Sequence, residues 1–248
     1  RQNLARAEHN DPDWQREISV SHNKVGYIQT LQGNLSTAHE SFSAALRIAE
    51  ILTQKDPGNT LWQRDLLISH TRIGDIHVKQ NNSVAAMEAY QAGLAVAEAL
   101  AKADPHNTEW QRDLSICHER IGDIYISQDS LAEALEAHQT SLGIRKALAK
   151  IDAKNTAWQR DVCISYNKIG HIHKAQGNPK GARNAHQASL NVAEVLAKAD
   201  PHNAEWQRDL IVSLVKLAEA NGDSATHYRR ALSIAERLES DGKIAPAD

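Results

Sequence analysis

Apolar residues recur along most of this chain every three or four positions, which is the spacing of one helix face. In the stretch 60–80 these positions are Trp62, Leu66, Ile73 and Ile76, with polar residues at most of the others. We therefore predict a helix from about residue 62 to residue 80. A second helix should follow a short turn at Asn81-Asn82 and end near KADPHN, residues 102–107, because proline blocks its continuation.

The same pattern returns every 48 residues, as shown by Trp14, Trp62, Trp110, Trp158 and Trp206. One helix pair cannot bury its apolar faces alone, whereas stacked pairs can. We therefore predict an all-α fold, an α-solenoid of five antiparallel helix pairs with units that start near residues 11, 59, 107, 155 and 203. The array should form a single domain over 1–240. We expect residues 1–10 to be the remnant of a preceding helix and 241–248 to be a flexible tail.

Helix ends are predicted from residues that can cap them. The N-cap of each second helix should be one of five residues whose side chains accept a hydrogen bond from free backbone N–H groups, namely Asn34, Asn82, Ser130, Asn178 and Asp223. The first helices of the later units should be capped by Asn59, Asn107, Asn155 and Asn203.

These residues resemble the tetratricopeptide repeat, whose signature is W-x2-L-G-x2-Y followed by a small residue, an aromatic and a second small residue. The matching positions are His118, Ile121, Gly122 and Tyr125 in the third unit, Ala86, Tyr90 and Gly93 in the second, and Ala38, Phe42 and Ala45 in the first. The resemblance covers residues 11–240 and implies a right-handed superhelix whose first helices line an inner groove. The unit here is longer than the usual 34 residues, and His22, His70 and His118 stand where the family has tryptophan.

Charge and motifs argue against several classes of function. The net charge is −3 with the two signs interspersed, which disfavours nucleic acid as a partner. No apolar run is long enough to predict a membrane helix, and no catalytic or cofactor motif such as GxSxG, GxGxxG or a P-loop occurs. The thirteen histidines lack metal-ligand spacing, and we expect Cys117 and Cys163 to be small buried residues in a reducing compartment. We predict a non-enzymatic cytoplasmic protein without cofactor or metal.

The tetrad WQRD, with WQRE in the first unit, contains every tryptophan of the chain. We interpret it as structural. The tryptophan would pack against the preceding unit, the arginine would pair with a carboxylate of a neighbouring unit, and the aspartate would lie in the first helical turn, where the helix dipole favours negative charge. An exposed tryptophan would instead favour a binding site.

In the inner groove that the resemblance implies, the first helices would present an apolar ladder, a basic ladder and a variable position. The candidate partner-binding residues are Val20, Lys24, Tyr27, Ile68, Arg72, Asp75, Ile116, Arg120, Asp123, Ile164, Lys168, His171 and Lys216. They would suit an acidic or amphipathic peptide or protein segment. Alternatively, Arg72–Asp75 and Arg120–Asp123 pair within their own helices, and the apolar ladder is consumed by packing between units. Tyr27 and His171 replace the acid in units one and four, so Lys24 and Lys168 should be less neutralised there.

The leading hypothesis is a protein-interaction scaffold, which the resemblance associates with larger bacterial signalling or effector proteins. The alternative is a self-assembly element that uses the N-terminal edge around Leu4 and Trp14. The oligomeric state stays open, a monomer included.

Overall fold

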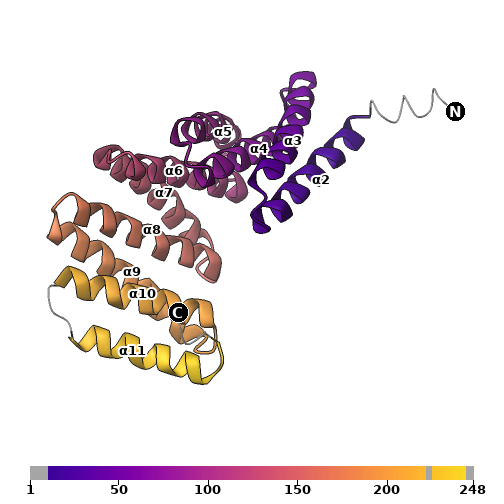
Figure 1. Cartoon of the computed structure of the whole chain (residues 1–248). Coiled ribbons are helices and arrows are strands. Elements are labelled where there is room, and N and C mark those ends of the chain that lie inside the picture. Colours follow the sequence, from indigo (N-terminus) through magenta and orange to yellow (C-terminus); the bar gives the residue numbers. More distant parts are fainter. Residues whose placement is uncertain (1–10, 222–224, 244–248) are drawn as a thin grey trace. The chain divides into compact units, whose positions relative to one another are not determined.

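The computed structural model describes residues 11–221 and 225–243, and within them every regular element is an α-helix (Figure 1). This confirms the predicted all-α helical repeat. The chain divides into an N-terminal part, residues 1–127, and a C-terminal part, residues 128–248, which are described separately. The handedness of the superhelix and the single domain over 1–240 stay predictions. The predicted helix remnant 1–10, with Leu4, and the predicted cap Asp223 lie outside the described residues.

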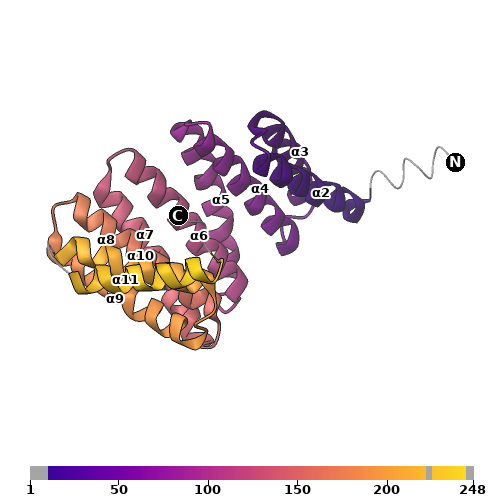
Figure 2. The same cartoon turned by 60° about the horizontal axis from the view of Figure 1, so that its bottom comes forward.

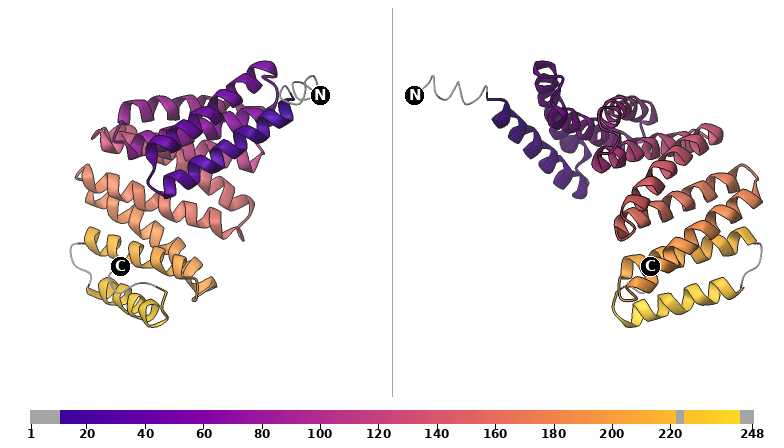
Figure 3. Two further views of the ribbon diagram at one scale, coloured as in Figure 1. Left: turned by 45° about the vertical axis from the view of Figure 1, so that its right-hand side comes forward. Right: turned by 180° about the vertical axis from the view of Figure 1, so that it is seen from behind.

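The described residues of the N-terminal part, 11–127, form five helices, and consecutive helices pack against each other from α2 to α6 (Figure 2). They are α2 (Pro12–Leu31), α3 (Leu35–Lys55), α4 (Thr60–Lys79), α5 (Ser83–Ala103) and α6 (Thr108–Ser127). The C-terminal part has the same alternation of first and second helices (Figure 3). Its helices are α7 (Leu131–Ile151), α8 (Thr156–Ala175), α9 (Pro179–Ala199), α10 (Ala204–Asn221) and α11 (Ala225–Ser240).

The predicted caps of the later first helices are confirmed. The side-chain oxygens of Asn59, Asn107, Asn155 and Asn203 accept hydrogen bonds from the backbone N–H of the four tryptophans at 3.1–3.2 Å. An aspartate ends the second helix before each of these caps and bonds the backbone N–H two residues later, as Asp104 does with His106 at 2.9 Å. Asp152 makes the same turn although Ala153 replaces proline, so the aspartate is enough to form this turn.

The caps of the second helices were predicted only in part. Asn82 and Asn178 accept the expected bonds from Ala85 and Gly181. Asn34 and Ser130 occupy the N-cap position without a side-chain capping bond. The residue before each of these four caps has a φ of 58–78°, a left-handed conformation that glycine or a short polar residue adopts at low cost. The turn therefore depends on that preceding residue, which is Gly33, Asn81, Asp129 or Gly177.

The two helices of a unit approach each other closely at the repeated glycine. A Cβ atom added to Gly74 would lie 2.4 Å from the Tyr90 ring, and one on Gly26 would lie 2.8 Å from the Phe42 ring. In the fourth unit the imidazole of His186 takes the same place against Gly170. A ring therefore fills the space beside the glycine in each of these units, whether it belongs to phenylalanine, tyrosine or histidine.

Candidate functional site

The arginine of WQRD joins one unit to the next, as predicted. The Nε atom of Arg16 lies 2.6 Å from the carboxylate of Asp65, and that of Arg64 lies 2.7 Å from Asp113. Arg160 pairs with Asp209 in the C-terminal part in the same way. Each arginine thus bonds the aspartate of the next WQRD, 49 positions later in the chain. The arginine of one tetrad and the aspartate of the next therefore form an ion pair that repeats between units.

The predicted role of the aspartate was wrong. Asp65 is the sixth residue of α4, which begins at Thr60, so it lies beyond the first turn where the helix dipole is effective. The arginine of the preceding unit is its main partner. Burial raises the pKa of the Asp65 carboxyl, and Arg16 acts in the opposite direction.

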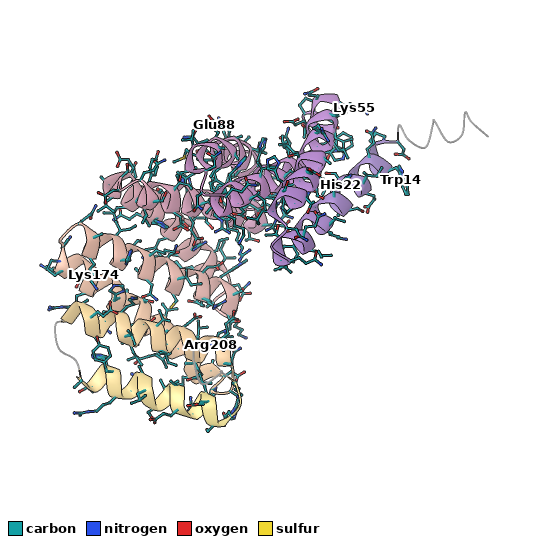
Figure 4. The ribbon with its side chains drawn as sticks, in the orientation of Figure 1. Trp14, His22, Lys55, Glu88, Lys174 and Arg208 are labelled. Atoms are coloured by element: carbon teal, nitrogen blue, oxygen red, sulfur yellow. The ribbon has the colours of Figure 1, made fainter. Side chains whose placement is uncertain are left out.

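The tryptophans of the tetrads differ in how far they are exposed. Trp62 is 9 % exposed, and Trp110 packs against Leu100 and Ala97 of the preceding unit. Trp14 on α2 is 55 % exposed (Figure 4). The packing role is therefore confirmed for Trp110 and is consistent with the burial of Trp62, whereas the tryptophan of the first unit is exposed.

Nine of the predicted groove residues lie together in the N-terminal part. Three hollows of about 650, 230 and 530 Å³ open along the first helices α2, α4 and α6, and all three share Arg72 in their walls. Their walls include the predicted residues Val20, Lys24, Tyr27, Ile68, Arg72, Asp75, Ile116, Arg120 and Asp123. The first helices thus form a continuous hollowed face in this part.

Asp75 is the centre of the charges on this face. Its carboxylate accepts a hydrogen bond from the Tyr90 hydroxyl at 2.8 Å and lies 3.3 Å from Arg120 and 3.8 Å from Arg72. Pairing of Arg120 within its own helix was one alternative, and the structure shows that Arg120 also reaches across to Asp75 on helix α4. Arg72 also lies over the ring of Tyr27, with 5.8 Å between the guanidinium carbon and the ring centre. Both arginines remain more than 40 % exposed at their side chains, so they are accessible to a ligand.

The remaining four predicted residues lie on α8 and α10 in the C-terminal part. Ile164 and Lys168 are half-buried, and His171 is exposed. Lys216 lies 3.5 Å from Glu219, whose carboxylate also accepts a bond from Lys174 at 3.0 Å. These bonds lower the pKa of Glu219. The structure describes these residues separately from the nine on α2, α4 and α6.

Sequence reasoning missed two kinds of residue. Leu31 and Val78 expose apolar side chains at the rim of the 530 Å³ hollow, and no repeated pattern marked them. Arg145 is buried where the sister units have alanine, and it donates to the Ser165 hydroxyl at 2.8 Å. Its signal was present in the sequence, because arginine replaces Ala49, Ala97 and Ala193 at this register.

Outside this face, burial is the main cause of the pKa shifts of Cys117 and His186. Burial raises the pKa of Cys117 to about 12 and lowers that of His186 to about 4. Among the described residues no three His, Cys, Asp or Glu side chains gather closely enough to hold a metal ion. None of the described helices has the length and apolar character needed to cross a membrane.

Comparison with known proteins supports the repeat assignment. Residues 162–203 match the family model described as Tetratricopeptide repeat. The solved structure of BtubC (BKLC) from P. vanneervenii is similar, with 15% identity, a TM-score of 0.71, and coverage of 99% of this chain and 89% of that one. A putative kinesin light chain from Podosopora anserina with nearly identical TPR-like repeats matches at 14% identity and a TM-score of 0.63, covering 95% of this chain and 100% of that one.

The apo form of RapI is a further similar structure, with 13% identity and a TM-score of 0.63. It covers 95% of this chain, which spans 58% of RapI. At these identities the three structures show a shared fold. No curated protein matches the sequence.

Proposed function

We propose that this chain, whose residues 162–203 match the Tetratricopeptide repeat model and whose described residues share the fold of solved repeat proteins, is a non-enzymatic protein-interaction scaffold. It binds a segment of a partner protein along the face formed by its first helices. The observation that carries this proposal is the run of three hollows along α2, α4 and α6, which share Arg72 and join apolar to basic side chains. Specific peptide contacts in proteins commonly combine such apolar hollows with a few charged groups.

The chemistry of the face favours a partner with both carboxylates and apolar side chains. Val20, Ile68 and Ile116 are half-buried, so part of each side chain remains available for contact. Lys24 is exposed, and no ion pair of Lys24 is found among the residues that the structure describes. The guanidinium groups of Arg72 and Arg120 can bind carboxylates with two parallel hydrogen bonds. Membership of a larger bacterial signalling or effector protein is part of the same proposal, and so is a cytoplasmic location.

The test is charge reversal on the first helices. The variant Arg72→Glu, Arg120→Glu, Lys168→Glu and the intact chain are used side by side to capture partners, which are identified by mass spectrometry. The affinity of each identified partner is then measured by calorimetry for both proteins. We expect the variant to bind at least tenfold more weakly while its circular dichroism melt stays cooperative. Equal affinity for a partner that binds the intact chain directly contradicts this function.

A second function, self-association through α2, is favoured by one observation. Trp14, Ile18, His22 and Val25 line an outer hollow of about 450 Å³. In the next unit the equivalent Trp62 and Ile73 are buried, and Ile73 packs against Ala38 and Phe42 of the first unit's second helix. If copies associate there, light scattering will give a mass that rises with concentration, and Trp14→Ala will abolish the rise. A mass that does not change with concentration contradicts self-association.

A further inference from the structure

The 530 Å³ hollow in the N-terminal part, called here the central hollow, has a mixed apolar and basic wall. Its floor includes Ile76 and the rings of Phe42 and Tyr90, all of which are nearly fully buried. Its rim includes Tyr27 and Leu31, which are 50 % and 69 % exposed. An exposed apolar rim above a buried apolar floor is the surface that a large apolar side chain covers most favourably.

The aromatic ring of Tyr27 also lines a second hollow, which is formed between α2 and α4. The charged residues in the wall of this second hollow are Arg16, Lys24, Arg64, Arg72 and Asp65. Asp65 is bound by Arg16, and Arg64 is bound by Asp113 and Glu109, which lie outside this wall. Lys24 and the outer side of Arg72 therefore carry most of the positive charge that faces solvent here. The apolar rim of the central hollow and this positive site meet at Tyr27 and Arg72.

Asp75 keeps Arg72 and Arg120 at this junction. It is held between them and the Tyr90 hydroxyl, and Tyr90 itself is locked against Gly74. A side chain whose position is set before binding loses less rotational freedom when it meets a ligand. The network thus prepares a cationic edge beside an apolar hollow.

Resting on the proposed scaffold function, we propose that this junction recognises a partner segment in which a carboxylate lies within a few residues of a large aliphatic or aromatic side chain. The carboxylate binds Lys24 and Arg72, and the apolar side chain enters the central hollow beside Tyr27 and Leu31. The two hollows share Tyr27 and Arg72, so both groups of one short segment can reach their sites together. Affinity arises from covering the apolar rim, and charge complementarity selects the acidic partner.

The experiment uses the whole chain and a phage-displayed library of random 12-residue peptides. Peptides selected by the intact chain are sequenced, synthesised and measured by fluorescence anisotropy. We expect enrichment of sequences with Asp or Glu within three residues of Leu, Ile, Phe or Trp. Binding of these peptides should weaken about tenfold for Tyr27→Ala, as for a contact at the centre of an interface. It should also weaken severalfold for Lys24→Glu and fall with added salt.

Two matched controls separate this site from general changes of surface. Tyr228→Ala removes a tyrosine of similar exposure from α11, and Lys180→Glu reverses an exposed lysine on the second helix α9. Neither should change peptide affinity, and circular dichroism melts confirm that all four variants fold.

The possible failures differ. Selected peptides that lack the paired chemistry, or that bind Tyr27→Ala and Lys24→Glu as tightly as the intact chain, overturn this inference and leave the scaffold function standing. If such peptides instead lose affinity with Lys168→Glu, the binding face lies in the C-terminal part. Failure of the library to yield any peptide that binds the chain contradicts both the inference and binding of a peptide segment by the first helices.

Discussion

The substitution Gly74→Ala tests the contact that sets the spacing of the two helices in the second unit. The new Cβ atom would lie 2.4, 2.6 and 2.9 Å from three carbons of the Tyr90 ring. Carbon atoms in proteins rarely come closer than about 3.5 Å without repulsion. The ring cannot easily move away, because it is 2 % exposed and its hydroxyl is bonded to Asp75.

Two effects of opposite sign determine how much Gly74→Ala changes the free energy of unfolding. Overpacking of a buried site costs about 1–3 kcal/mol, and a distance this short belongs at the upper end of that range. Replacement of glycine by alanine inside a helix returns about 1 kcal/mol. We therefore expect a net loss of about 2 kcal/mol, which lowers the Tm of a chain of this size by about 4–8 °C.

Gly143→Ala is the matched control. Gly143 also lies inside a helix, α7, but a Cβ atom added there has no neighbour within 4 Å. This variant should gain about 0.5–1 kcal/mol from helix propensity alone. The comparison uses thermal and urea unfolding followed by far-UV circular dichroism. In a Tyr90→Leu background the cost of Gly74→Ala should shrink, because the smaller side chain leaves room for the methyl group.

The reasoning fails if Gly74→Ala stabilises the chain as Gly143→Ala does. That outcome would mean that the helices of the second unit are farther apart than the structure shows. A cost that stays the same in the Tyr90→Leu background would place the clash somewhere other than the ring.

Three further results are expected. Trp110→Ala should destabilise the chain by about 3 kcal/mol because this ring packs against the preceding unit, while Trp14→Ala should change stability by less than about 0.5 kcal/mol; equal Tm shifts would contradict this packing. Asp113→Asn should cost about 1 kcal/mol through its half-buried bond to Arg64, and a double-mutant cycle with Arg64→Gln that shows no coupling would exclude a stabilising ion pair. Burial lowers the folded-state pKa of His186 below that of the unfolded chain, so stability contributed by the neutral ring is present above about pH 6.5 and is lost as pH falls toward 4. His186→Phe should reduce the loss of Tm between pH 7 and pH 4.5, and an unchanged acid loss would place the sensitive group elsewhere.

The fold was predictable because the same pattern of apolar and polar residues occurs in five units. A single apolar spacing such as that of Trp62 and Leu66 is weak, but its recurrence in register specifies helix type, helix length and stacking together. Asparagine caps at the first helices were predictable for the same reason. The caps at Asn34 and Ser130 were not, because a local turn set by the preceding residue made the side-chain bond unnecessary.

The candidate site was predictable to the level of a helix face. Helical spacing puts Lys24, Arg72 and Arg120 on equivalent faces of their helices, but it does not say which carboxylate each will reach. One alternative paired Asp75 with Arg72 of its own helix, and in the structure Asp75 also contacts Arg120 and Tyr90 from two other helices. The free energies of alternative ion pairs of a long side chain differ by only tenths of a kcal/mol. Which pair forms therefore depends on the distances between helices.

The sequence by itself determined the repeat, the helix pairs and the role of the WQRD arginine in joining units, because these follow from spacing along one chain. Only the tertiary structure decided that Arg64 bonds the next unit's Asp113, that Trp14 stays exposed, and that Tyr27 and Arg72 border two hollows. Helical periodicity states which residues share a face. The separation and packing of neighbouring helices decide which of those residues touch.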